Sequence, residues 1–283
     1  MMIRAWLILA DILIIFLLIA SLILFYLYPP QKEKFAFSRL DGGLTSEVFN
    51  MPTIDLNATI TLEDLIAMPK EEYMIENRFL SRTLEEALKS IEGEVGDPIF
   101  IRIFKEVSLL EVWMYAKGRY KHLKDYTICA YSGLLGPKLQ EGDRQAPEGF
   151  YTVKKHQLNP NSKFHLSFNL GYPNAYDRVH KRTGSFLMVH GNCVSVGCYA
   201  MTDEKIEEIY DLVQSALQKG QKYVQVHAYP FRMTEERMAF YSESKWYDFW
   251  MNLKEGYDYF EGEHIPPHVK VEKKRYAIYE TDQ

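Results

Sequence analysis

The pattern of hydrophobic and polar positions first separates an apolar N-terminus from the rest of the chain. Residues 5–28 read AWLILADILIIFLLIASLILFYLY, and Asp11 is their only charged residue. At about 1.5 Å per residue, a helix of this length crosses a hydrocarbon core of about 30 Å. Aromatic residues at its end suit a membrane interface, and Pro29-Pro30 would stop the helix. We therefore predict a membrane anchor within residues 1–30.

A cleavable secretory signal is the alternative for these residues. The apolar part of such a signal usually covers about 7–15 residues and ends in small side chains. This run is longer and ends in Phe25 and tyrosines, which favours an uncleaved anchor. Arg4 lies before the run and Lys32 and Lys34 lie after it, so charge alone does not fix the orientation.

Residues 31–97 are expected to form a linker with short helices. The first part mixes charges, glycines and a proline without clear periodicity. Thr61 precedes the helix-like stretch LEDLIAM, and Thr83 stands three residues before Glu86, which is capping-box spacing.

Residues 98–270 show the pattern of a β-rich domain, followed by a tail at 271–283. Runs rich in β-branched and aromatic residues are separated by Gly, Pro or Asn, and they read IFIRIF, EVWMY, YTICAYS, FYTV, FHLSFNL, SFLMVH and KYVQVHAY. Three amphipathic helices are expected as well: one capped by Asp203 and closed by Gly220, one opening at Thr234, and one from Trp246 that ends at Gly256. The fold class is thus α+β, with a mainly β core, flanking helices and the N-terminal anchor.

Composition excludes some classes of function. The chain has 33 basic and 38 acidic residues, a formal charge of −5, and no basic run that would neutralise phosphates, so nucleic-acid binding is not expected. Three cysteines are too few for a disulfide scaffold, and an odd number leaves at least one thiol free unless it pairs between chains. Cys129 lies in an apolar run and is expected in the core.

The segment 188–203, MVHGNCVSVGCYAMTD, carries the strongest chemical signal. His190 ends an apolar run, and Gly191 and Gly197 would let the chain reverse and bring the imidazole to Cys198. A neighbouring imidazole can accept the thiol proton, and backbone N–H groups around Gly197 and Cys198 could stabilise an oxyanion. This arrangement suits acyl transfer.

Other interpretations of the same residues stay open. A single buried cysteine is often only a small hydrophobic residue, and a histidine after a strand is often a hydrogen-bonded core residue. Zinc binding by His190, Cys193 and Cys198 fits the ligand types but not the usual spacing, and a redox disulfide between Cys193 and Cys198 lacks the CxxC spacing.

The motif resembles a known family. VHGNCVSVGC, with His190-Gly191 and Ser195 ahead of Gly197-Cys198, is similar to the signature of the L,D-transpeptidase catalytic (YkuD) domain. Longer stretches, including SGLLGPKLQEGDRQAPEGFYTV and LNPNSKFHLSFNLGYPNAYDR, resemble its YafK-like branch over residues 98–270.

This resemblance implies a cysteine acyltransferase of cell-wall biogenesis and cell shape, in which Cys198 is the nucleophile and His190 the proton acceptor and donor. It would act on diaminopimelate-containing peptidoglycan stem peptides through a thioester, without metal or cofactor. The catalytic domain would face the periplasm from the inner membrane, or be secreted there after signal cleavage. One alternative is an amidase that releases a lipoprotein from peptidoglycan diaminopimelate. Another is a membrane-tethered peptidoglycan-binding module without catalysis.

The chain departs from the family after the cysteine. Many members have an arginine or asparagine shortly after it, whereas Tyr199-Ala200-Met201 follows here. Arg182, Lys138 and Asn192 are candidates to contact a substrate carboxylate instead, because guanidinium, ammonium and amide groups can donate to it. The alternative is that each of them only fixes a loop.

Overall fold

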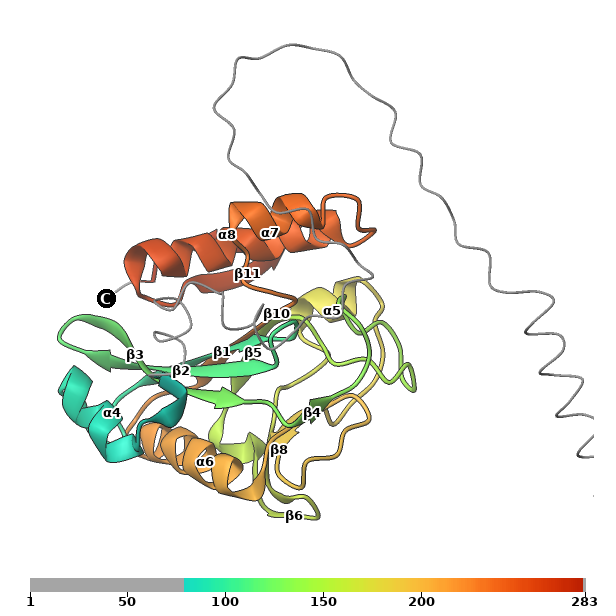
Figure 1. Cartoon of the computed structure of the whole chain (residues 1–283). Helices are drawn as coiled ribbons and strands as arrows, with labels where there is room; N and C mark the ends of the chain where they lie inside the picture. Colours follow the sequence, from blue (N-terminus) through green and yellow to red (C-terminus); the bar gives the residue numbers. More distant parts are fainter. Residues whose placement is uncertain (1–78, 282–283) are drawn as a thin grey trace, which may run out of the picture. The chain divides into compact units, whose positions relative to one another are not determined.

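Two five-stranded sheets and a hairpin organise residues 79–281, the part of the chain that this computed structural model describes (Figure 1). The first sheet has the order β3-β2-β1-β10-β5 and comprises β1 (Ile99–Phe104), β2 (Leu109–Ala116), β3 (Arg119–Thr127), β5 (Gly149–Val153) and β10 (Val224–Tyr229). The second has the order β4-β9-β8-β7-β6 and comprises β4 (Ala130–Tyr131), β6 (Leu158–Ser162), β7 (His165–Asn169), β8 (Met188–His190) and β9 (Tyr199–Ala200). The hairpin pairs β11 (His268–Glu272) with β12 (Arg275–Tyr279).

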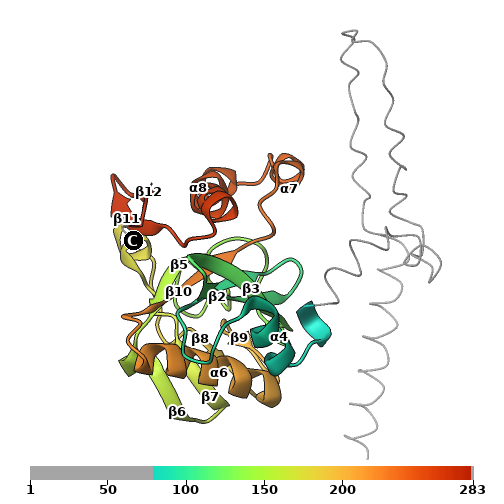
Figure 2. The ribbon, with the colours of Figure 1, turned by 90° about the vertical axis from the view of Figure 1, so that its left-hand side faces the viewer.

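Helices lie on both sides of the first sheet. The helices of the described residues are α4 (Leu84–Ile91), α5 (Ala175–Val179), α6 (Asp203–Gln218), α7 (Glu235–Phe240), α8 (Tyr247–Glu263) and the short 3-10 helix η1 (Lys155–Gln157). Figures 1 and 2 place α7 and α8 on one side of this sheet and α6 on the other. The α+β class with a β-rich core is therefore confirmed for the described residues.

The side chains of β1 are buried on both faces of the sheet. All six residues of β1 are buried, as expected for a central strand covered on both faces. Ile101 and Ile103 belong to an aliphatic core that includes Ile206 of α6, whereas Phe104 joins an aromatic core with Trp250 of α8. Because side chains alternate across a strand, one sequence run supplies both cores.

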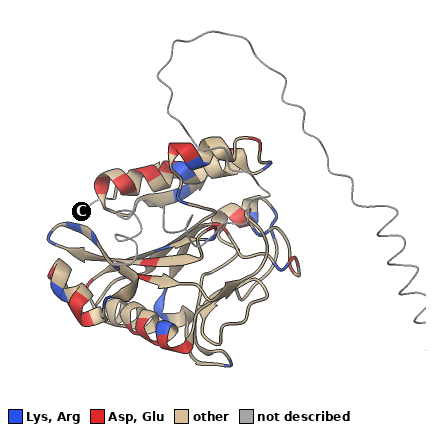
Figure 3. Ribbon diagram, viewed as in Figure 1, with Lys and Arg blue, Asp and Glu red and all other residues tan. Residues whose placement is uncertain are grey.

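Charged residues are concentrated on the helices. In Figure 3 the blue and red segments fall mainly on the helices, while most strand ribbons are tan. The predicted apolar face of α6 is confirmed, since Ile206, Ile209, Val213 and Leu217 are all buried. This amphipathic pattern lets α6 cover the sheet and keep its acidic side chains in solvent.

The N-terminal capping residues were predicted correctly at two helices and one residue too late at a third. Thr83 and Glu86 form the predicted capping box of α4, and Thr234 caps α7. At α6, however, Thr202 occupies the N-cap position, and Asp203 is the first helical residue.

Several predicted boundaries were wrong. Helix α8 continues through Gly256 to Glu263, because Gly256 serves close packing: a Cβ there would lie 2.7 Å from the Phe150 ring. Residues 271–279, expected as a tail, belong largely to the β11-β12 hairpin. The run YTICAYS does not form one strand but is divided between the end of β3 and β4.

The predicted anchor at 5–28 and the helix after Thr61 lie outside the described residues. Within residues 79–281, no helix combines the length and apolar character that crossing a bilayer requires.

Candidate active site

Strand pairing brings the predicted histidine and cysteine to one face of the second sheet. β8 and β9 are parallel, with Val189 opposite Tyr199 and His190 opposite Ala200. Cys198 immediately precedes β9 and therefore falls opposite Met188, two residues before His190. Residues two apart in a strand share a face, and diagonal neighbours there lie about 7–8 Å apart, within reach of long side chains. The register thus directs the thiol and the imidazole to the same side.

The His190 side chain is held as a neutral base. It is buried, and its Nδ1 lies 2.7 Å from the Gly191 carbonyl oxygen. Because a carbonyl only accepts, Nδ1 carries the proton and Nε2 keeps a free lone pair. Burial lowers the pKa of His190, an effect partly offset by the hydrogen bond to Gly191. Phe164 lies against the ring at a centroid distance of 4.8 Å.

The Cys198 thiol is half-buried and is the free cysteine among residues 79–281. Its Sγ accepts the Met188 N–H at 3.4 Å and lies 3.6 Å from the Phe186 carbonyl oxygen. Burial raises the pKa of the thiol, while the Met188 hydrogen bond and the charge of Lys138 lower it by less. The sulfur therefore holds its proton at neutral pH and needs a base to become a nucleophile.

The turn after His190 depends on the absence of a side chain at Gly191. A Cβ there would lie 2.6 Å from Asp203 Oδ1 and 3.0 Å from the Phe164 carbonyl oxygen. The Gly191 N–H donates to the Phe164 and Leu166 carbonyls, and the next amide, of Asn192, donates to Asp203 Oδ1 at 2.7 Å. The first residue of α6 thus fastens the start of the loop.

A disulfide fastens the middle of the same loop. Cys193 is bonded to Cys129 across a Cα–Cα distance of 5.3 Å, and both residues are exposed. The prediction that Cys129 is a core residue was wrong, because its short apolar run ends at the surface. The bond also argues against two alternatives: Cys193 is neither a thiolate ligand for zinc nor paired with Cys198.

The glycines and serine of the motif build the loop that leads to the nucleophile. Gly197 has a φ of +118°, a conformation that favours glycine. Its N–H donates to Ser195 Oγ at 3.2 Å, and this hydroxyl donates to the Cys198 carbonyl at 2.7 Å. The Gly191 amide donates to the carbonyls of Phe164 and Leu166 and the Gly197 amide to Ser195, so this structure does not present either one as an oxyanion donor.

Comparison with known proteins identifies the family. The model of the L,D-transpeptidase catalytic domain (YkuD) matches residues 106–226, which include His190 and Cys198. The chain is also 50% identical over 184 residues to YafK of Escherichia coli K12, provisionally named an L,D-transpeptidase; the match covers 65% of this chain and 75% of that protein. The chain belongs to the L,D-transpeptidase catalytic domain family. The resemblance predicted from the motif is confirmed.

Solved structures are less similar to this chain. The helical cell shape determining protein Pgp2 from Campylobacter jejuni shares 19% identity at a TM-score of 0.38, covering 67% of this chain and 80% of that one. Bd1075 from Bdellovibrio bacteriovorus shares 17% identity at a TM-score of 0.35, covering 64% and 79%. These values are too low to carry an argument about the site.

Two of the residues predicted to contact a substrate carboxylate already have acidic partners within this chain. The Arg182 guanidinium is buried and donates to Asp177 Oδ1 at 2.8 Å. Lys138 forms an ion pair with Asp143 and donates to the Gln140 carbonyl at 2.9 Å. Both placements favour the loop-fixing interpretation, although the charge of Lys138 still acts on the thiol.

Asn192, the third candidate, is exposed in the active-site loop and has a φ of 64°. Asn174 and Asp177 cap α5 with reciprocal hydrogen bonds.

Sequence reasoning missed a buried ion pair behind the site. Lys105 and Glu148 are fully buried and lie 3.0 Å apart. Lys105 Nζ also donates to the carbonyls of Leu134 and Gly136 at 2.7 and 2.9 Å, and Glu148 accepts the Gly136 N–H at 2.7 Å. The pair therefore fixes from inside the segment that presents Lys138. The lysine after the apolar run IFIRIF was the only signal for it.

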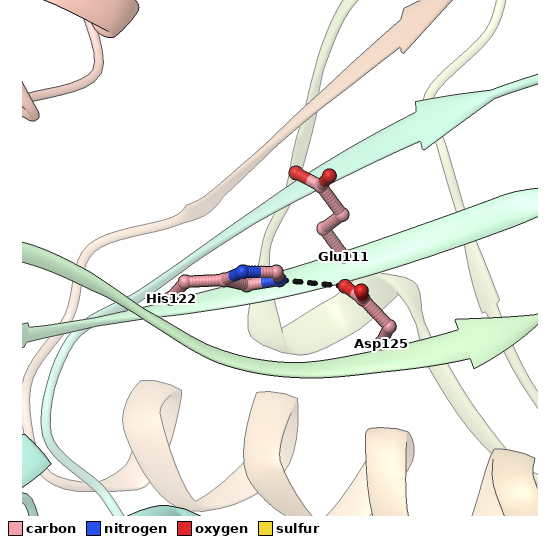
Figure 4. A group of neighbouring side chains, drawn as sticks. All are labelled: Glu111, His122 and Asp125. Atoms are coloured by element: carbon pink, nitrogen blue, oxygen red, sulfur yellow. Dashed lines mark hydrogen bonds and ion pairs between the residues drawn. The ribbon is translucent and has the colours of Figure 1, made fainter. Parts of the chain in front are cut away.

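One cluster of possible metal ligands lies on the first sheet. Ligand atoms of Glu111, His122 and Asp125 lie within 4.8 Å of one another, and Figure 4 shows His122 bonded to Asp125. Burial alone would raise the pKa of Glu111, but ion pairs with Arg102 and Arg232 outweigh it and bring the pKa to about 2. Two guanidinium groups already neutralise this carboxylate, so the cluster fits an ion-pair network better than a cation site.

Proposed function

We propose that this member of the L,D-transpeptidase family remodels peptidoglycan with Cys198 as its nucleophile. The observation that supports the proposal is the pairing of β8 with β9, which puts the Sγ of Cys198, the free cysteine among residues 79–281, 3.4 Å from the Met188 amide nitrogen, two residues before His190. The substrate would be a stem peptide, attacked at the carbonyl of diaminopimelate.

The proposed reaction proceeds by general-base catalysis. His190 Nε2 accepts the thiol proton as Sγ attacks the carbonyl carbon, and the carbonyl oxygen becomes an oxyanion. The C–N bond then breaks, the departing amine takes the proton from His190, and a thioester remains on Cys198. An amine or a water molecule resolves the thioester and returns the thiol. The neutral imidazole and the protonated thiol support this order of events, since neither charge is formed in advance.

We further propose that the domain works in the periplasm, anchored through residues 5–28. The bond between Cys129 and Cys193 supports an oxidising compartment, because disulfides persist there and are rare in the cytosol. Peptidoglycan outside the inner membrane would then be within reach.

The test is a mass-spectrometric muropeptide profile of sacculi that bear attached lipoprotein. They are incubated with the full-length protein or with its Cys198→Ala variant. New cross-links between diaminopimelate residues, absent with the variant, would establish transpeptidation. Freed lipoprotein without new cross-links would establish the amidase reaction instead. Identical profiles with both proteins would refute the catalytic proposal and favour a binding module.

Selective alkylation gives a second test of the nucleophile. Cys198 should react with iodoacetamide in the oxidised protein, and His190→Ala should slow this reaction at neutral pH because the base is lost. An unchanged rate in the His190 variant would contradict the assigned role of the imidazole.

A further inference from the structure

A cavity of about 490 Å³ opens beside the candidate nucleophile. Its walls come from β5, η1, the end of β7, the start of α5 and residues 185–186. Phe186 lines this cavity, and its carbonyl oxygen lies 3.6 Å from Cys198 Sγ. The cavity and the thiol thus have Phe186 as a common neighbour, although Cys198 itself does not line the cavity.

The cavity is basic although the whole chain is acidic. Lys154, His156 and Arg178 line it, and no aspartate or glutamate does. Neither Lys154 nor Arg178 has a carboxylate within ion-pair distance among residues 79–281, in contrast to Arg182. Cations of one sign in a concave wall raise the local concentration of anions. Lys154 and Arg178 therefore carry charges without an acidic partner, whereas the charge of Arg182 is already paired.

Arg178 is also partly preoriented. Its Nη1 donates to the Pro173 carbonyl at 2.5 Å, which holds one edge of the guanidinium. The remaining N–H groups stay available for an incoming acceptor, and a guanidinium fork matches the geometry of a carboxylate.

The cavity wall does not accept a peptide as an added strand. β5 is the edge strand of its sheet, but side-chain amides already cap its outward carbonyls. Asn174 Nδ2 donates to the Phe150 carbonyl at 2.9 Å, and Gln157 Nε2 donates to the Thr152 carbonyl at 3.1 Å. Recognition here must use side chains and not strand pairing.

We propose that this cavity binds a free carboxylate of the peptide substrate, with Lys154 and Arg178 as specificity-determining residues. The proposal rests on the proposed function and adds to it the chemical group that the enzyme selects. The sources of that group are the side-chain carboxylate of diaminopimelate, the free α-carboxylate of the γ-linked D-Glu and the C-terminal carboxylate of the stem. Six bonds of about 1.5 Å separate the attacked carbonyl of diaminopimelate from its side-chain carboxylate, and the zigzag of an extended carbon chain shortens them to a span of about 7–8 Å.

Binding is measured without catalysis to separate this proposal from the previous one. Full-length Cys198→Ala protein is titrated by calorimetry with the tetrapeptide L-Ala-γ-D-Glu-diaminopimelate-D-Ala. Adding Lys154→Gln and Arg178→Gln to this protein gives the double variant. The double variant should bind the tetrapeptide about tenfold more weakly at low salt, because two charge contacts are lost. Lys89→Gln removes an exposed cation on α4, away from the cavity lining, and should leave affinity within about twofold.

Three peptides, each amidated at one of these carboxylates, distinguish the sources. The recognised carboxylate is the one whose amidation weakens binding to the Cys198→Ala protein about tenfold and causes no further loss of affinity in the double variant. Equal binding of every peptide by the Cys198→Ala protein and the double variant would overturn the proposal. So would failure of the Cys198→Ala protein to bind the unmodified tetrapeptide.

Turnover with Cys198 intact supplies an independent readout. With Cys198 present, the same Lys154→Gln and Arg178→Gln substitutions should raise KM about tenfold with little change in kcat. The alkylation rate at Cys198 should then equal that of the wild type. If the Cys198→Ala protein retains turnover, the proposed function fails while the binding result still stands. A lower kcat with unchanged KM in the double variant would contradict a carboxylate subsite.

Discussion

Removal of the disulfide tests how firmly the active-site loop is held. We consider Cys129→Ser with Cys193→Ser, made in the Cys198→Ala protein so that no free thiol can exchange. The bond joins the surface before β4 to the loop between His190 and Cys198. Its loss removes a covalent constraint but no residue of the two cores.

The expected magnitude follows from the sequence separation of 64 residues between the bonded cysteines. In the chain-entropy model, a loop of this length restricts the unfolded chain by about 14 cal/mol/K, or about 4 kcal/mol at 25 °C. For a domain of about 200 residues, each kcal/mol corresponds to about 2–4 °C in Tm. We therefore expect Tm to fall by about 10 °C.

Circular dichroism of the full-length proteins during heating measures this change. The Cys198→Ala protein, oxidised and then reduced with dithiothreitol, provides the control and should lose the same amount on reduction. A Tm within about 2 °C of the parent would refute the reasoning, since it would mean that the bond does not constrain the unfolded chain.

Three further predictions concern the base, the buried ion pair and the turn. Because burial lowers the pKa of His190 and raises that of Cys198, kcat/KM should be flat at pH 7 and fall on the acidic side as pH drops below about 6.5, where the imidazole gains a proton. An acidic fall of kcat/KM centred above pH 7 would contradict this. Lys105→Met leaves Glu148 buried without its cation and should cost about 3–5 kcal/mol in urea unfolding, part of which Glu148→Gln restores; an unchanged midpoint would argue against the pair. Gly191→Ala places a Cβ 2.6 Å from a carboxylate oxygen and should lower stability by about 1–3 kcal/mol and turnover at least tenfold; wild-type turnover would show that the turn adapts.

Local signals in the sequence predicted much of the fold. The β-branched and aromatic content of IFIRIF marked β1, and the spacing of Thr83 and Glu86 marked the start of α4. Both signals are local, since they depend only on residues close together in the chain. Gly256 misled the prediction, because a glycine that admits a neighbouring ring has the same appearance in sequence as one that ends a helix.

The candidate site was predictable to the extent that its chemistry is contained in one segment. His190 and Cys198 lie eight positions apart, and the intervening glycines indicated a reversal. The partner of Cys193 lies 64 residues away, so no local pattern predicts that bond. The buried position of Lys105 was likewise hidden, because it depends on Glu148, which lies 43 positions further along the chain, just before β5.

The connectivity of the disulfide also bears on how the active enzyme is made. In an unfolded chain Cys193 meets Cys198, five positions away, far more often than Cys129, which is 64 positions away. Loop-closure entropy favours the short ring by about 2 kcal/mol, or roughly fiftyfold. Oxidation before folding would therefore favour a disulfide between Cys193 and Cys198, and thiol–disulfide exchange would be needed to free the Cys198 thiol. The yield of active enzyme should depend on a disulfide isomerase, even though the mature protein contains a single bond.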